Sequence, residues 1–89
     1  MLAFANKPRI LLFQEAVDMR KGFETLSSVV EGHFNIDVTS GAYFVFLNRR
    51  RDRMKVLYWD NDGLVIWYKR LEQGIFPKHR GSASNIFYQ

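Results

Sequence analysis

Residues 42–70 contain three apolar runs of strand length, joined by two short connections that are rich in charged or turn-forming residues. The runs cover residues 42–47, about 54–60 and 64–70. The second connection, Asp60-Asn61-Asp62-Gly63, is a strong hairpin signal because glycine accepts a positive φ without penalty. The pattern therefore predicts a meander of three antiparallel strands.

Two segments before residue 40 add a strand and a helix to this meander. Residues 9–13 form a short apolar run whose length fits a strand. After Asp18, apolar side chains recur at helical spacing, at Met19, Phe23, Leu26, Val29, Val30 and either His33 or Phe34. We expect Asp18 to be the N-cap, because its carboxylate can accept hydrogen bonds from the first turn. The predicted helix runs from residue 19 to about 33 and ends at Gly32 or near Asn35.

These elements predict an α+β fold, in which one helix packs on a mainly antiparallel meander sheet of three to four strands. Both faces of the strands are apolar, and one helix can cover only one face. The other face requires the C-terminal segment, a second copy of the chain or a partner, because a bare apolar face is unusual in a monomer. We therefore expect self-association as a homodimer, with contacts from Tyr43, Trp59, Trp67 and Tyr68.

The size and composition of the chain limit its organisation. Its 89 residues suffice for a single small domain over residues 1–89, with one compact core. The chain has no cysteine, which excludes disulfides and thiolate metal sites and is compatible with a cytoplasmic location. No apolar run approaches the ~20 residues that span a bilayer, and residues 1–9 do not resemble a signal peptide.

The polar residues do not form a recognisable catalytic or metal-binding motif. His33 and His79 are far apart in the sequence, and neither has a carboxylate at ligand spacing. Two-metal chemistry needs several carboxylates that converge on one pocket. The aspartates are instead explained as cap or turn residues, namely Asp18, Asp52, Asp60 and Asp62. We therefore predict no enzyme activity, no metal and no cofactor.

The connection between the first two runs of the meander carries a basic cluster, formed by Arg49, Arg50, Arg51, Arg53 and Lys55. Strand pairing would extend this cluster to Arg20, Lys21, Lys69 and Arg70. Basic side chains beside aromatic surface suit a nucleic acid, because the cations meet phosphates and the rings stack on bases. The alternative is a solvated hairpin tip that discourages aggregation at a sheet edge. The net charge of +4 is compatible with both interpretations.

Three blocks of the sequence occur in the same order in one known family: DMRKGFETL at 18–26, SGAYFVFLNRRRDRMKVLYWDNDGL at 40–64 and YKRLEQGIF at 68–76. Over about residues 8–77 the chain resembles the accessory protein encoded by the second reading frame of insertion sequence family sixty-six. That protein is often called TnpB, a name it shares with unrelated RNA-guided nucleases. The resemblance implies a bacterial mobile-element protein that accompanies a separate, larger transposase and takes part in transposition.

The resemblance assigns no activity and no catalytic residue. It implies a non-enzymatic accessory factor, which we expect to bind DNA, the transposase of the same element, or both through the basic hairpin tip. The alternative is a protein-interaction module that docks through an aromatic sheet face without direct DNA binding. Members of the family carry a further leucine-rich C-terminal segment, which we expect this chain to lack.

Overall fold

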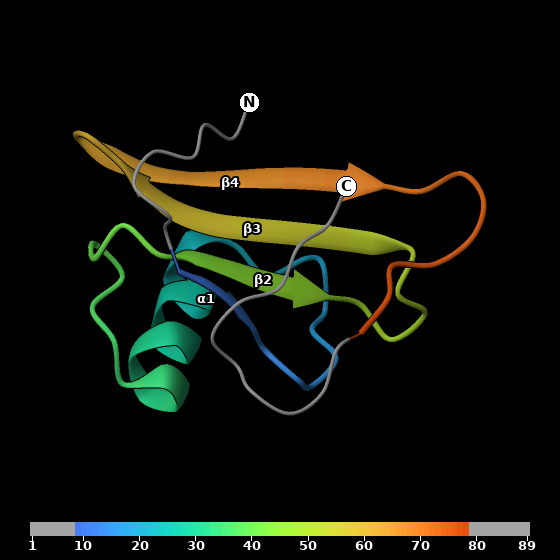
Figure 1. Cartoon of the computed structure of the whole chain (residues 1–89), viewed down its shortest axis with the longest axis horizontal. Coiled ribbons are helices and arrows are strands. Elements are labelled where there is room, and N and C mark those ends of the chain that lie inside the picture. The colour runs from blue at the N-terminus through green and yellow to red at the C-terminus, as the bar shows by residue number, and fades with distance from the viewer. Residues whose placement is uncertain (1–8, 79–89) are drawn as a thin grey trace.

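The computed structural model describes residues 9–78, and these residues contain one α-helix and a four-stranded sheet (Figure 1). The elements are β1 (Ile10–Leu12), α1 (Phe23–Val29), the π-helical turn η1 (Val30–Phe34), β2 (Tyr43–Leu47), β3 (Arg53–Asp60) and β4 (Gly63–Arg70). This is the predicted α+β fold, and the four strands lie where the apolar runs predict them.

The strands are ordered β1-β2-β3-β4 across the sheet. Strands β2, β3 and β4 pair antiparallel, with Val56 opposite both Val45 and Trp67, and they form the predicted meander. Strand β1 pairs parallel with β2. A parallel pair needs a crossover connection, which the segment containing α1 provides.

The tight turn between β3 and β4 confirms the predicted hairpin but corrects its physical reason. Asp60 pairs with Gly63, so Asn61 and Asp62 form the two-residue connection. The residue with a positive φ is Asn61, at 57°, and not Gly63. Asparagine tolerates the left-handed region better than most residues, and it meets the conformational demand of this turn.

The predicted start of the helix at residue 19 is wrong, and Asp18 is not its N-cap. Helix α1 begins at Phe23. Its N-cap is Gly22, which is extended, so no side chain caps the helix. The Asp18 carboxylate accepts from the backbone N–H of Arg20 instead, and this local turn competes with helix formation. The other end agrees with the sequence, because Asn35 adopts a left-handed conformation immediately after η1.

Helix α1 packs against one face of the sheet, which we call the helix face (Figure 1). Leu26 and Val30 are fully buried there against large side chains of β2 and β3. The buried members of this cluster are Leu11, Leu26, Val30, Val38, Ala42, Phe44, Phe46 and Leu57.

The second face of the sheet carries its own core and is not bare. Its buried members are Ile10, Leu12, Val45, Leu47, Met54, Val56 and Phe76. Phe76 belongs to the segment after β4, so part of the C-terminal segment covers this face. Of the aromatic residues expected to be exposed, Tyr43, Trp59 and Trp67 are half-buried, and only Tyr68 is exposed.

Candidate nucleic-acid interface

Four residues of the basic cluster lie at the tip of the β2–β3 hairpin or at its junction with β3, namely Arg49, Arg50, Arg51 and Arg53. Asn48 organises this tip: its carbonyl accepts from the N–H of Arg51 at 3.0 Å, and its side-chain Oδ1 accepts from the N–H of Arg53 at 3.0 Å. Its Nδ2 donates to Asp52 Oδ1 at 2.6 Å. This amide bond lowers the pKa of Asp52, and the nearby charges of Arg50 and Arg53 lower it further against the opposing effect of burial. The carboxylate therefore stays ionised as an acceptor within the turn.

Two flanking segments hold the hairpin tip from outside. After β4, the chain turns back toward the tip (Figure 1), where the N–H groups of Leu71 and Phe76 donate to the carbonyls of Asp52 and Arg51, each at 2.7 Å. On the other side, the N–H of Val17 donates to the carbonyl of Leu47 at 2.9 Å. These backbone bonds give the tip a defined conformation, so its arginines project from a fixed frame.

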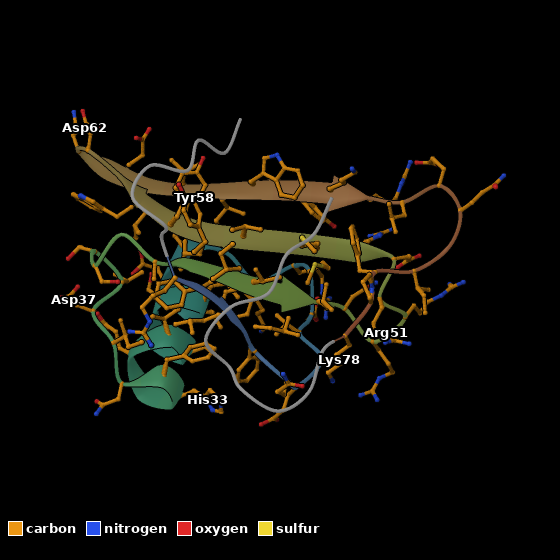
Figure 2. The ribbon with its side chains drawn as sticks, in the orientation of Figure 1. His33, Asp37, Arg51, Tyr58, Asp62 and Lys78 are labelled. Atoms are coloured by element: carbon orange, nitrogen blue, oxygen red, sulfur yellow. The ribbon has the colours of Figure 1, made fainter. Side chains whose placement is uncertain are left out.

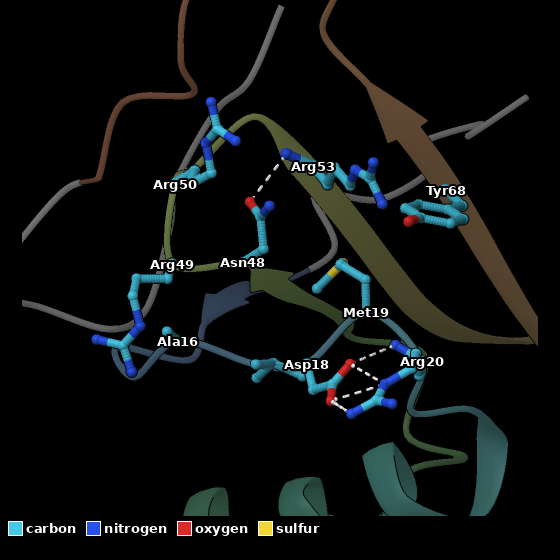
Figure 3. Close-up of a pocket in the computed structure, with 10 residues that line it drawn as sticks. Ala16, Asp18, Met19, Arg20, Asn48, Arg49, Arg50, Arg53 and Tyr68 are labelled. Atoms are coloured by element: carbon cyan, nitrogen blue, oxygen red, sulfur yellow. Dashed lines mark hydrogen bonds and ion pairs between the residues drawn. The ribbon is translucent and has the colours of Figure 1, made fainter.

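A hollow of about 630 Å³ opens between the tip, the segment before α1 and the adjoining ends of β3 and β4 (Figure 3). It is lined by Ala16, Val17, Asp18, Met19, Arg20, Asn48, Arg49, Arg50, Arg53 and Tyr68. Figure 3 shows Arg53 extending toward the Tyr68 ring, with Asp18 and Arg20 facing each other on the opposite wall. The hollow thus combines several guanidinium groups with one aromatic ring.

The arginines of this region divide into paired and unpaired groups. Arg20 is bound by Asp18 at 2.7 Å, and Arg70 is bound by Glu72 at 3.0 Å. Within residues 9–78, no ion pair or side-chain hydrogen bond engages the guanidinium groups of Arg49, Arg50, Arg51 or Arg53. The unpaired groups at the hollow, Arg49, Arg50 and Arg53, are therefore the ones available to an anion.

The pair of Asp18 and Arg20 forms a fixed polar wall of the hollow. Asp18 accepts from the backbone N–H of Arg20 at 2.9 Å, from its Nε at 3.0 and 3.1 Å, and from its Nη2. The Arg20 guanidinium is the main reason that the pKa of Asp18 falls to about 2, and Asp18 in turn raises the pKa of Arg20. Both charges are present at neutral pH and largely offset each other.

Lys55 was predicted to contact phosphate from the hairpin tip, but it lies within β3 and its side chain is only 8% exposed. Its ammonium donates to the carbonyl oxygen of Lys21 at 2.8 Å and lies 4.9 Å from the centre of the Tyr68 ring. Lys55 therefore fixes the segment before α1 to the sheet. Both contacts engage the ammonium within the protein.

The remaining predicted residues do not all share one surface. Arg70 pairs with Arg53 across β3 and β4, so both lie on the helix face of the sheet, where the hollow opens. Lys69 pairs with Met54 and therefore lies on the second face. Arg51 contributes to a separate, smaller hollow that Lys78 also lines. Lys21 is exposed in the segment before α1, and its carbonyl helps to fix this segment to the sheet.

Charges of both signs occur at each end of the sheet. Arg51 and Lys78 lie at the end of the hairpin tip, and Asp37 and Asp62 lie at the opposite end (Figure 2). Asp52 also lies in the tip, and Arg9 precedes β1 at the opposite end.

The other polar residues do not suggest a second site. Residues 9–78 contain no group of three histidine, cysteine, aspartate or glutamate side chains placed to hold a metal ion. His33 packs edge-on against Phe13 with ring centres 4.8 Å apart, and His79 lies outside the described residues. Over the same range, the helices are all too short or too polar to cross a membrane.

Tyr68 and Asn48 line the hollow, although neither was among the site residues predicted from the sequence. Tyr68 was expected at a dimer contact, yet it shares the helix face with Arg53 and Arg70. The alternation of side chains along β4 carries this information, because residues 68 and 70 lie on the same face of a strand. Asn48 precedes the basic cluster, in a position where asparagine is typical of turns.

Comparison with known proteins identifies the family. The family described as IS66 Orf2 like protein matches residues 8–87. The chain belongs to this family. Its membership confirms the resemblance seen in the three sequence blocks and implies an accessory role in transposition.

Two relatives of this IS66 Orf2-like protein come from Sinorhizobium fredii (strain NBRC 101917 / NGR234). The uncharacterized protein y4jC is 36% identical over 80 residues, which are 88% of this chain and 68% of the relative. The uncharacterized protein y4hO is 31% identical over 88 residues, which are 97% of this chain and 76% of the relative. No solved structure matches the chain. The geometry of the hollow is therefore the main guide to what this protein binds.

Proposed function

We propose that this IS66 Orf2-like protein is a non-enzymatic accessory factor that binds DNA through the hairpin tip and the adjoining hollow. The observation that carries the proposal is the set of unpaired guanidinium groups of Arg49, Arg50 and Arg53 around one hollow. Backbone bonds from two flanking segments hold the tip that presents them. A fixed backbone lowers the conformational entropy that the tip loses on binding.

Arginine suits a phosphate better than lysine does at such a site. Its planar guanidinium donates two parallel hydrogen bonds to one phosphate, and charge-assisted bonds of this kind are stronger than neutral ones. Phosphate contacts fix the position and orientation of a protein on DNA but carry no sequence information. The proposed role is therefore to hold DNA during transposition, with sequence selection left to other contacts.

A salt titration of duplex DNA binding tests the proposal. If the tip makes about 3 to 5 phosphate contacts, the logarithm of affinity falls with the logarithm of salt concentration at a slope of about −3 to −4.5. The triple variant Arg49→Ala, Arg50→Ala and Arg53→Ala is expected to flatten the slope by about one unit for each lost contact.

Arg9→Ala is the matched control for this titration. Arg9 is exposed and precedes β1, at the end of the sheet away from the hairpin tip, because β1 runs parallel to β2. The control removes the same kind of charge and should leave the slope nearly unchanged. Absence of DNA binding at low salt overturns the proposal and favours the transposase as the partner.

A further inference from the structure

The ring of Tyr68 is exposed in the wall of the hollow and contacts the ammonium of Lys55. Tyr68 is 48% exposed, although it lies on a strand between other ordered side chains. The ammonium of Lys55, a residue that is only 8% exposed, lies over one face of the ring, 4.9 Å from its centre. The ring lines the hollow and also a smaller one that it shares with Arg53, Arg70 and Glu72. Arg53 extends toward the ring (Figure 3).

We propose that the hollow binds an unpaired nucleotide of a DNA strand, with the base stacked on Tyr68 and the adjoining phosphates on Arg53 and Arg50. This inference rests on the proposed function and specifies the form of DNA that the site prefers. Proteins that bind single strands combine a basic track for the backbone with aromatic side chains on which bases stack. Both components line this one hollow.

The shape of the hollow favours an unpaired nucleotide over a base pair. Within a duplex, both faces of each base are covered by neighbouring bases, so no face is available to an aromatic side chain in a concave wall. The volume of about 630 Å³ lies within the ~300–1,000 Å³ typical of sites for small molecules. A duplex can contact the arginines, but it cannot stack a base on Tyr68 without releasing that base from the helix.

The side chains of the hollow offer different chemistry to the two parts of a nucleotide. Met19 and Tyr68 supply apolar surface for a base, and Figure 3 shows Met19 on the wall between Asp18 and Asn48. Arg50 and Arg53 supply cations that no carboxylate among residues 9–78 neutralises by an ion pair. The ion-paired Asp18 and Arg20 leave the far wall with little net charge, so the phosphates are directed toward Arg50 and Arg53.

Fluorescence anisotropy with three labelled probes tests this inference: a single DNA strand of mixed sequence, the matching duplex, and an RNA strand of the same sequence. The native protein is expected to bind the DNA strand more tightly than the duplex. Tyr68→Leu should weaken single-strand binding by about 5- to 100-fold, the range for the loss of one stacked base. Tyr68→Phe retains the ring and should keep the native preference.

Trp59→Leu is the control for aromatic deletion, because Trp59 lies on the same face of the sheet near the opposite end. It should not change the preference between strand and duplex. Thermal unfolding of each variant checks that the fold is kept. Tyr68→Phe removes only the hydroxyl, so the ring stays in place over Lys55.

The outcomes separate this inference from the proposed function. If duplex and single strand bind equally and Tyr68→Leu changes neither, the inference is overturned while DNA binding through the arginines stands. If the RNA strand binds more tightly than the DNA strand, the assignment to DNA is overturned. If no nucleic acid binds at low salt, both the inference and the proposed function fail.

Discussion

The ammonium of Lys55 donates a 2.8 Å hydrogen bond to the carbonyl oxygen of Lys21, which lies 34 positions earlier in the chain. This bond joins a buried side chain of β3 to the segment that precedes α1. The same segment lines the hollow through Asp18, Met19 and Arg20. The position of one wall of the candidate site therefore depends on a lysine that the sequence grouped with the phosphate contacts.

Replacement of this lysine should affect stability more than DNA binding. Lys55→Met keeps an apolar stem of similar length and removes the ammonium. We expect the free energy of unfolding to fall by about 1.5–3 kcal/mol, the value of a hydrogen bond to a charged group. Urea denaturation measures this change. The matched control is Lys69→Met, an exposed lysine of β4, which should stay within about 0.5 kcal/mol of the native protein.

The salt slope of DNA binding provides the opposing test for Lys55. Because Lys55 is only 8% exposed and its ammonium binds the carbonyl of Lys21, Lys55→Met should leave the slope unchanged. A loss of about one unit of slope would show that Lys55 contacts a phosphate, as the sequence predicted, and would contradict the structural role.

The ionisation of Asp18 should depend on Arg20. The carboxyl has a pKa of about 2 in the folded protein, against an ordinary value of 3.8. Since the folded pKa is the lower one, the contribution of Asp18 to stability is present above about pH 3.8 and is lost as the pH falls toward 2. NMR titration of the Asp18 carboxyl carbon should give this value, and Arg20→Gln should raise it toward 3.8.

Asp37 is the internal control in the same titration. Hydrogen bonds from the backbone N–H and the hydroxyl of Thr39 lower its pKa. Thr39 belongs to another turn and does not line the hollow. Arg20→Gln should therefore leave the pKa of Asp37 unchanged. An Asp18 pKa that does not respond to Arg20→Gln would contradict the observed ion pair.

The strands could be predicted from the sequence because their apolar runs are bounded by strong turn signals. The start of the helix could not, because Asp18 is an equally good partner for a helix end and for a nearby arginine. In the structure, the Asp18 carboxylate binds Arg20, which lies two positions later in the chain. The burial of Lys55 could not be predicted for a related reason: charge suggests exposure, whereas the register places Lys55 between Phe46 and Tyr68 inside the sheet.

The turn between β3 and β4 should be sensitive at Asn61 and tolerant at Asp62. Asn61 has a φ of 57°, whereas Asp62 is not among the residues with positive φ. A β-branched residue in the left-handed region is strained, so Asn61→Val should reduce the free energy of unfolding by about 1–2 kcal/mol. Asp62→Val is the control and should cost less. Equal costs, measured by thermal unfolding, would contradict the assigned turn geometry.

The core on the second face of the sheet should depend on Phe76 and not on its neighbour Ile75. Phe76 is 7% exposed and packs with Val45, Met54 and Val56, whereas Ile75 is 53% exposed. Phe76→Ala should reduce the free energy of unfolding by about 3–5 kcal/mol, because it leaves a cavity and removes apolar contact. Ile75→Ala should change it by less than about 0.5 kcal/mol.

The same pair of variants tests whether Phe76 limits self-association through the second face. If Phe76 covers this face, Phe76→Ala exposes apolar surface, and light scattering should show more association at high protein concentration than for Ile75→Ala.

The hairpin tip should also respond to Phe76→Ala, because the N–H of Phe76 donates to the carbonyl of Arg51. Loosening that bond should weaken DNA binding along with stability. A Phe76→Ala protein of native stability would show that this face is covered in another way.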